Sequence, residues 1–528
     1  MKPLPSNFIE NKQIKSLFFH TLFLSTLLRI ILASFTELGN DEVYYINYAL
    51  FPDVSHFDHP PFVGWLIQLT TLNLHFTHEF FVRLAPVLIG LLNTCIIFAI
   101  CKHLKNEKTG LYAALLYTAS FYSFIVVGVF IMPDTAQSIF WFLSLWIIVV
   151  IFKKEQIDRK SQLLMLLLGF TVGCGMLSKY TTLFIWGGVG LYLLFFNRKW
   201  FAKPSLYLAP VITALVFLPV IIWNINHDFI TFSFHSGRIT GNSLTFNKQT
   251  FLIETVGSFF YNNFIAVGII VAAISVYFRN KYVDKKIFGL LLFLSLPLIL
   301  LFIGISMVKP TLPHWSGPGY YALMLLAALF LDRKPKQKII PLSLIVALAT
   351  LLIVIVFAFL QIKTGMFNLS KNAPVERMGH SDFTLDMYGY KQLNEQFKEL
   401  RKKHIQQNIM PENPVIVGYK WFPASHIDFY VARPNKIPFL TLSPLYDAHE
   451  YFWITEKKGG VKEGMSAYFF NSSRYHFNME NWSAHFESMS PLDTIYIYRN
   501  NKEVMFYVVW YLQQANNISL PNENHSWN

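Results

Sequence analysis

Long apolar runs alternate with short clusters of basic residues along this sequence, and this alternation constrains the fold more than any other feature. Runs such as LLNTCIIFAI, FWFLSLWIIVVIF and SLIVALATLLIVIVFAFL are, with their apolar flanks, long enough to cross a bilayer. Hydrophobic residues make up 53% of the 528 residues and charged residues only 14%, whereas soluble domains carry roughly 25% charged residues. A polytopic membrane protein is therefore predicted.

About eleven membrane-spanning helices are predicted from the apolar runs. They lie near residues 16–36, 82–101, 110–130, 136–152, 162–178, 181–196, 205–223, 252–278, 287–306, 316–331 and 339–361. The first run lacks a clear small-residue cleavage site, so we expect it to stay in the protein as a signal anchor.

The basic clusters predict the orientation of these helices. They fall in alternate connections: Lys102, Lys105, Lys108; Lys153, Lys154, Arg159, Lys160; Arg198, Lys199, Lys203; Arg279, Lys281, Lys285, Lys286; and Arg333, Lys334, Lys336, Lys338. The positive-inside rule places these connections and the N-terminus in the cytoplasm. The formal net charge of +13 is thus interpreted as a topology signal, and no nucleic acid partner is predicted.

The remaining connections are expected on the outer side of the membrane, with the long loops at 37–81 and 224–250 among them. Beyond residue 361 the apolar runs give way to a charged helical pattern, YKQLNEQFKELRKKH, and to β-like runs, PVIVGY, IPFLTL, YFWIT, TIYIY and EVMFYVVWYL. The predicted fold class is an all-α polytopic membrane domain over residues 1–361, followed by a soluble periplasmic α/β domain over residues 362–528.

Two acidic positions on the outer side are possible catalytic residues. Asp41 and Glu42 follow Asn40, so this segment is either a capped helix start or a catalytic acid pair. Asp134 lies in the short turn IMPD, where it either caps the next helix or provides a second carboxylate. Two carboxylates at one membrane depth would suit activation of an acceptor hydroxyl or binding of a divalent cation.

Four basic residues lie at outer helix ends, where the topology rule disfavours them: Arg83, Lys179, Arg238 and Lys309. Each of them either extends toward lipid headgroups or binds an anion such as a lipid-linked phosphate. For Lys179 the second interpretation is favoured, because LSKY separates two short helices and leaves little room for a solvated loop. Arg29 lies inside the first span and has two interpretations. Its side chain either extends to the membrane interface or lines the same phosphate-binding cavity.

Two outer segments are rich in aromatic and polar residues. WNINHDFITFSFHSGR ends at Arg238, and KPTLPHWSGPGY contains His314, Trp315 and Tyr320. Such residues either form an interfacial aromatic belt or line a binding site for a sugar, which presents an apolar face and a rim of hydroxyls.

Several motifs in order resemble the bacterial branch of the GT-C glycosyltransferases. They are DE-x-YY, HPP, RLAPVLIG, MPD, GMLSKYT, IWN-x-x-H and K-x-x-x-x-HW-x-x-x-x-Y, and they extend over roughly residues 25–330. That branch includes the protein O-mannosyltransferase-like enzymes and the aminoarabinose transferase of lipid A. The resemblance implies a GT-C fold and an enzyme that transfers one sugar from a polyprenyl phosphate, with inversion at the anomeric carbon.

The resemblance also implies roles for individual residues. Asp41, with Glu42, matches the acid treated as general base or metal ligand, and Asp134 matches the second outer acid. Tyr45 and His59 fall where the aminoarabinose transferase contacts the carrier phosphate, although that enzyme has a lysine at the position of His59. Arg238 and Lys309 lie in segments that line its carrier cavity, and a possible divalent metal would have Asp41, Glu42 and His59 as its ligands.

Three functions follow from these features. The leading prediction is sugar transfer from undecaprenyl phosphate to an envelope glycolipid such as lipid A or its core glycan, and the second is transfer to hydroxyls of exported proteins. The third is a flippase or transporter for lipid-linked sugars, which would require charges at mid-membrane depth and internal pseudo-repeats. For the C-terminal domain, acceptor recognition is the hypothesis.

Overall fold

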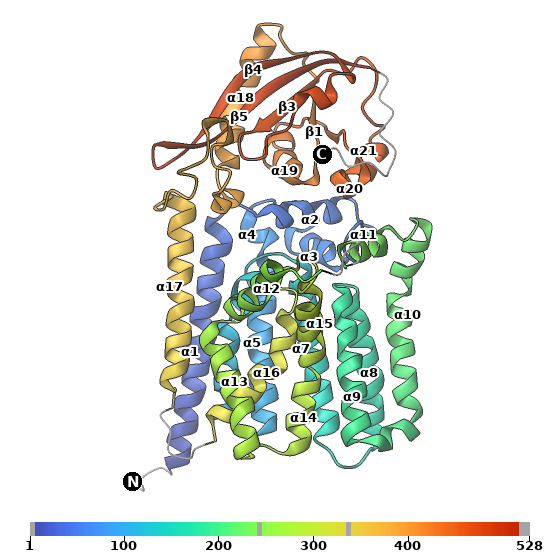
Figure 1. Cartoon of the computed structure of the whole chain (residues 1–528), viewed down its shortest axis with the longest axis vertical. Coiled ribbons are helices and arrows are strands. Elements are labelled where there is room, and N and C mark those ends of the chain that lie inside the picture. Colours follow the sequence, from blue (N-terminus) through green and yellow to red (C-terminus); the bar gives the residue numbers. More distant parts are fainter. Residues whose placement is uncertain (1–5, 240–244, 334–338, 517–528) are drawn as a thin grey trace. The chain divides into compact units, whose positions relative to one another are not determined.

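The computed structural model describes residues 6–239, 245–333 and 339–516, without the side chains of residues 6–9, 238 and 239. The chain forms two compact units (Figure 1). The helical unit comprises residues 1–34 and 52–354, and the mixed unit comprises residues 35–51 and 355–528. The segment that carries the DE-x-YY motif therefore groups with the C-terminal part of the chain, and the predicted domain boundary after residue 361 stays a prediction.

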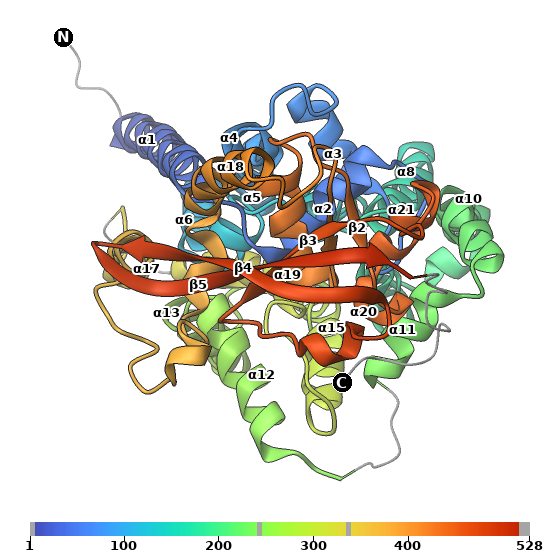
Figure 2. The same cartoon turned by 90° about the horizontal axis from the view of Figure 1, so that it is seen from above.

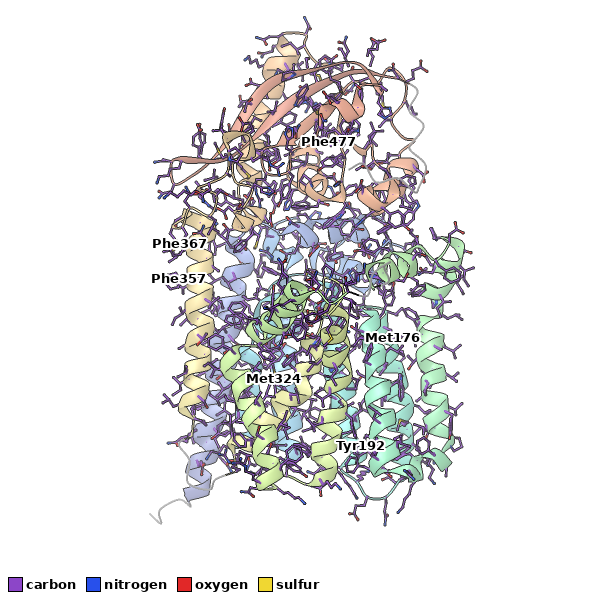
Figure 3. All side chains as sticks on the ribbon, viewed as in Figure 1. Met176, Tyr192, Met324, Phe357, Phe367 and Phe477 are labelled. Carbon is purple, nitrogen blue, oxygen red and sulfur yellow. The ribbon has the colours of Figure 1, made fainter. Side chains whose placement is uncertain are left out.

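The helical unit is built around two buried helices. Its helices are α1 (Ser6–Phe35), α3 (Phe62–Thr71), α4 (Glu79–Val82), α5 (Leu84–Leu104), α6 (Glu107–Ala119), α7 (Pro133–Phe152), α8 (Arg159–Met176), α9 (Phe184–Phe196), α10 (Pro204–Asn226), α11 (Ile230–Ile239), α12 (Lys248–Tyr261), α13 (Phe264–Arg279), α14 (Lys285–Phe293), α15 (Leu296–Ser306), α16 (Tyr320–Leu331) and α17 (Leu342–Thr364). Nearly every residue of α6 and all of α16 are buried, so these helices form the centre of the core. Met324 on α16 and Tyr192 on α9 are two of its side chains (Figure 3).

Six helices of the described part are long and apolar enough to cross a membrane: α1, α5, α7, α10, α14 with α15, and α17. A bent pair adds one more span if its two helices are counted together, and three shorter apolar helices accompany them. These helices support a multi-pass membrane protein. The count of about eleven spans and the orientation of the termini stay predictions, and Lys334, Lys336 and Lys338 of the last basic cluster lie outside the described residues.

The span predicted near 252–278 is not one straight helix, because α12 and α13 meet at an angle of 94°. Asn263 lies at the break with a φ of 64°, a conformation that asparagine tolerates better than most residues. Its side-chain amide donates hydrogen bonds of 2.9 Å to the backbone oxygens of Ala119 and Ala347. These tertiary contacts stabilise a sharp turn that could not be predicted from the sequence, because no glycine or proline lies at the break.

The mixed unit holds a five-stranded sheet (Figure 2). Its elements are α2 (Asn40–Leu50), α18 (Tyr390–Gln406), β1 (Val415–Gly418), α19 (Trp421–Ile427), β2 (Phe439–Thr441), α20 (Leu445–Ala448), α21 (Glu450–Lys457), β3 (Ala467–Ser472), β4 (Phe486–Arg499) and β5 (Lys502–Ala515). The strand order is β2-β1-β3-β5-β4, with β1 parallel to both neighbours and β5 antiparallel to β3 and β4. The predicted α/β content of this region is confirmed, but its solubility is not tested.

One of the predicted strands is wrong. The run YFWIT lies in the helix α21, where Tyr451, Phe452 and Ile454 are buried. Aromatic and β-branched residues favour strands mainly because they pack well on a half-buried surface, and tertiary packing overrides that preference here. The strand β3 was not predicted, whereas β4 and β5 join through Asn500 and Asn501, whose positive φ angles suit a tight hairpin.

Candidate functional site

A buried ion pair between Lys179 and Asp134 forms the centre of the polar cluster in the helical unit. The Nζ atom of Lys179 lies 2.7 Å from Oδ2 of Asp134, and the residues are 7% and 1% exposed. Pro133 begins α7, so Asp134 lies in its first turn, as predicted. Its carboxylate is bound by other elements, however, so the interpretation of Asp134 as a simple helix cap is wrong.

Tyr122 provides the second partner of Asp134. Its hydroxyl donates a 2.9 Å hydrogen bond to Oδ1 of Asp134 from a π-helical turn, Tyr122–Val126. Such turns are rare in proteins, and a large share of those that occur lie at functional sites. Gly317 makes room for the tyrosine ring, because a Cβ atom at Gly317 would lie 2.4 Å from it. Tyr122 was not predicted, because it lies inside an apolar run and has no local signal.

His59 interacts electrostatically with both members of this ion pair. Burial above all, with contributions from the nearby His235 and Lys179, lowers the pKa of His59 to about 3, against the opposing effect of Asp58. The Nε2 atom of His59 is 3.9 Å from Oδ2 of Asp58, and Nε2 of His235 is 2.6 Å from the backbone oxygen of Asp58. His59 is therefore neutral near pH 7, so it does not replace the lysine of the aminoarabinose transferase as a cation.

His314 also lies near the ion pair, whereas its two predicted companions have other surroundings. Burial lowers the pKa of His314 to about 4, against the attraction of Asp134. Trp315 packs against Phe302, and Tyr320 is buried with its hydroxyl 3.4 Å from Oγ of Ser258. Of the predicted substrate-lining residues, His314 thus joins the cluster around Asp134.

The remaining cations are in different environments. Arg83 is buried, with Nη1 3.4 Å from the backbone oxygen of Ala33 and its guanidinium over the ring of Phe130. Lys309 is half-buried and lies three residues after the end of α15. The side chain of Arg238 lies outside the described residues. Arg29 is fully buried with its guanidinium 4.5 Å from the Phe124 ring, so it does not extend to the interface.

Asp41, Glu42 and Tyr45 lie on α2 in the mixed unit. Gly39 directly precedes the helix, so Asn40 is not its cap. Instead, Oε2 of Glu42 accepts a 2.8 Å hydrogen bond from the backbone N–H of Gly39, which assigns Glu42 a capping role. Glu42 and Tyr45 are buried, whereas Asp41 is exposed.

The side chains present do not fit the possible metal site. Within the described ranges, no group of three or more His, Cys, Asp or Glu residues is arranged to hold a metal ion. Glu42 is engaged with the backbone of Gly39, and Asp41, as its direct neighbour, points to a different side of the helix. No catalytic step is therefore derived through a metal.

The structure thus brings Asp134, Lys179, His59 and His314 together in the helical unit and Asp41, Glu42 and Tyr45 together in the mixed unit. Besides Tyr122, the cluster includes Asp58 and His235, which the sequence offered only as members of polar loops.

Comparison with known proteins agrees with the sequence motifs. A family model described as dolichyl-phosphate-mannose-protein mannosyltransferase matches residues 58–223. The lipid A galacturonosyltransferase RgtD of Rhizobium johnstonii is 25% identical over 316 residues. The match covers 58% of this chain and 64% of RgtD, so it extends over less than two thirds of that relative.

Two solved structures share the fold. The ArnT protein of Cupriavidus metallidurans in the apo state superposes with a TM-score of 0.62 at 15% identity, and its complex with undecaprenyl phosphate with a TM-score of 0.61 at 16% identity. Each alignment covers 93% of this chain and 97% of ArnT. At such identities the likeness shows the fold alone. The family model and the curated relative agree with the resemblance to the GT-C glycosyltransferases that the motifs indicate, and the ArnT structures agree with the expected fold.

Proposed function

We propose that this protein transfers a single sugar from a polyprenyl-phosphate-linked donor to an acceptor on the periplasmic face of the bacterial inner membrane. The leading acceptor is an envelope glycolipid such as lipid A or its core glycan. The N-terminus would lie in the cytoplasm and the C-terminal unit in the periplasm. The names of RgtD and of the complex of ArnT with undecaprenyl phosphate support this choice of acceptor and carrier.

The observation that carries the proposal is the buried cluster of Asp134, Lys179 and Tyr122 in the helical unit, where a carboxylate is held by a cation and a phenol hydroxyl. Ionisable residues in a membrane protein are costly, and their presence usually marks a functional site. The basic and polar side chains around this cluster suit a phosphate headgroup, which is bound best by charge-assisted hydrogen bonds.

The proposed reaction is a direct displacement at the anomeric carbon. Asp41 would accept the proton of the acceptor hydroxyl while its oxygen forms a bond to the anomeric carbon, on the side opposite the phosphate. The bond between that carbon and the phosphate oxygen breaks, and the polyprenyl phosphate leaves with the electron pair. Because the attack comes from the opposite side, the configuration of the anomeric carbon is inverted. General-base catalysis of this kind contributes about 10²- to 10⁴-fold.

The leaving phosphate gains negative charge, so positioned donors lower the barrier. An ammonium group has three N–H donors, and Asp134 accepts one of those of Lys179. The other two N–H groups would bind phosphate oxygens, assisted by Lys309, Arg238 and Tyr45. His59 would contribute as a neutral hydrogen-bonding group, because burial lowers its pKa to about 3.

A second function, transfer to hydroxyls of exported proteins, is favoured by one observation. The matching family model describes protein mannosyltransferases, and its matched region, residues 58–223, contains Asp134 and Lys179. Both functions would use the same donor and the same residues, so they differ only in the acceptor that gains the sugar.

The decisive experiment compares cells that carry the wild-type protein, Asp41→Asn, or a deletion of the gene. Mass spectrometry of lipid extracts, envelope glycolipids and exported proteins is expected to show one sugar mass missing from one acceptor in both defective strains. The lipid-linked donor should accumulate in the same strains. The class of molecule that loses the sugar distinguishes the glycolipid from the protein acceptor.

The control is Glu155→Gln, a carboxylate on the short α7–α8 connection, which should leave the modification unchanged. If Asp41→Asn retains the full modification, Asp41 is not the base. If the deletion alters only which leaflet holds the lipid-linked sugar, the protein is a flippase and the proposal of transfer is refuted.

A further inference from the structure

The helix α2, which carries Asp41, is bound by residues of the C-terminal part of the chain nearly four hundred positions away. Its contacts begin just before the helix. The carboxylate of Glu37 accepts hydrogen bonds of 2.9 and 3.3 Å from the backbone N–H groups of Tyr390 and Lys391, the first residues of α18. A carboxylate is favoured there by the unpaired N–H groups and the positive end of the helix dipole.

Three further hydrogen bonds hold α2 and the residues directly before it. The backbone N–H of Leu38 donates to the hydroxyl of Tyr430 at 2.8 Å. Nε2 of His426 lies 2.9 Å from Oδ1 of Asn40. At the other end of the helix, Nη2 of Arg433 donates to Oδ1 of Asn47 at 3.1 Å. The polar contacts thus hold both ends of an eleven-residue helix.

These contacts determine which way Asp41 faces. Asn40, Tyr44 and Asn47 follow the i, i+4, i+7 spacing of one helix face. The ring of Tyr44 packs against Trp421, with centroids 5.1 Å apart, and that face of α2 packs on α19 (Figure 1). Asp41 directly follows Asn40, so its side chain leaves the helix about 100° away from that of Asn40, and it is exposed.

The groups that hold α2 are themselves rigidly held. Arg433 forms two hydrogen bonds with the carboxylate of Asp428, of 3.2 and 2.7 Å, and the hydroxyl of Tyr451 donates to that carboxylate at 3.0 Å. His426 is buried and stacks on Tyr390 at 3.9 Å. Burial holds the pKa of His426 well below its usual range, so its neutral ring has one N–H to donate.

We propose that the C-terminal part of the mixed unit is a positioning platform for the catalytic helix α2, and that His426 and Arg433 are positioning residues for Asp41. This inference rests on the proposed role of Asp41 as the base. It replaces acceptor recognition as the main role of this part of the chain. Because effective base catalysis requires a fixed geometry, small displacements of α2 reduce the rate of transfer for every acceptor.

The test uses the full-length protein in proteoliposomes with a polyprenyl-phosphate sugar donor and the acceptor identified in cells. His426→Ala is expected to lower kcat about tenfold while KM for the donor changes less than twofold. His426→Gln retains an N–H donor for Asn40 and should restore most of kcat. In a double-mutant cycle, Asn40→Ala should add little to the loss caused by His426→Ala, because both remove the same contact.

His404→Ala is the matched control. His404 is also a buried histidine of this unit, and it bonds to the hydroxyl of Tyr468 at 3.1 Å rather than to α2. It should lower the stability of the unit, measured by limited proteolysis, without the loss of kcat. A fall in kcat for His404→Ala equal to that for His426→Ala would overturn the platform, because any destabilisation of the unit would then be enough to lower kcat.

The two proposals fail in different ways. If Asp41→Asn is inactive but His426→Ala and Arg433→Ala keep wild-type kcat, the platform is refuted and the base assignment stands. If Asp41→Asn is fully active, the base assignment fails, and the platform fails with it. If His426→Ala changes only which acceptor is used, the platform is refuted in favour of acceptor recognition.

Discussion

Replacing Lys179 by methionine is expected to destabilise the helical unit, because the carboxylate of Asp134 would remain buried without its cation. The two groups are 2.7 Å apart, and their side chains are 9% and 2% exposed. Removing one partner of such a buried pair costs about 3–5 kcal/mol. Methionine matches the lysine stem in length, so the loss reports the charge rather than a cavity.

The double variant Lys179→Met, Asp134→Asn should be more stable than Lys179→Met alone. The asparagine carries no charge, and its side-chain oxygen still accepts the hydrogen bond from Tyr122. A recovery of at least about 2 kcal/mol is expected, because the dominant cost in the single variant is the uncompensated charge. The coupling energy between the two positions should therefore be large and favourable.

The assay is thermal or chemical unfolding of the detergent-purified variants under identical conditions. Lys154→Met is the matched control, since Lys154 forms a 2.8 Å ion pair with Asp158 in which both side chains are exposed. An exposed pair is worth about 0–1 kcal/mol, so this variant should unfold almost like the wild type. The reasoning is refuted if Lys179→Met matches the control, or if the double variant loses the sum of the two single effects.

Three further changes test other parts of the structure by the same unfolding measurements. Tyr122→Phe should cost about 1.5–3 kcal/mol, as expected for a hydrogen bond to a charged group, whereas Tyr277→Phe, whose buried hydroxyl has no hydrogen-bond partner among the described residues, should be nearly neutral. Asn263→Ala should be about 1 kcal/mol less stable than Asn263→Gly, because both lose the side-chain bonds but only glycine adopts a φ of 64° freely; equal stability would contradict the role of the backbone. The pKa of His59 is lowered to about 3 in the folded protein from about 6.5 in the unfolded chain, so the folded protein loses stability as the pH falls from 6.5 toward 3. His59→Gln should remove about 2 kcal/mol of the stability loss between pH 7 and pH 5. An unchanged pH dependence of stability would contradict the burial of His59.

Much of the membrane part could be predicted from local sequence patterns. An apolar run long enough to span a bilayer must form a helix there, because its backbone groups find no other partners in lipid. The helices α1, α5, α7, α10 and α17 accordingly lie where the apolar runs predicted them. The pattern could not locate the break at Asn263, which depends on carbonyl oxygens of Ala119 and Ala347 that are distant in the sequence.

The acidic positions were also visible in the sequence, but their partners were not. Asp41 and Asp134 were predicted as catalytic candidates because the apolar runs place both carboxylates on the outer side at one membrane depth. Tyr122 had no signal of its own, since a tyrosine in an apolar run is compatible with simple core packing. Likewise, Lys179 was predicted as a phosphate contact, while its ion pair with Asp134 became apparent only in the folded unit.

The sequence by itself determined the multi-pass helical class, the α/β content of the C-terminal region and the resemblance to the GT-C glycosyltransferases, because these depend on local hydrophobicity and residue spacing. Only the tertiary structure decided that YFWIT is a helix, that Asp134 is paired, and that the helix of Asp41 belongs to the C-terminal unit. These outcomes depend on contacts between residues far apart in the chain, such as Asn40 with His426. Local propensity carries no information about such contacts, since their energy exists only once the partners have been brought together.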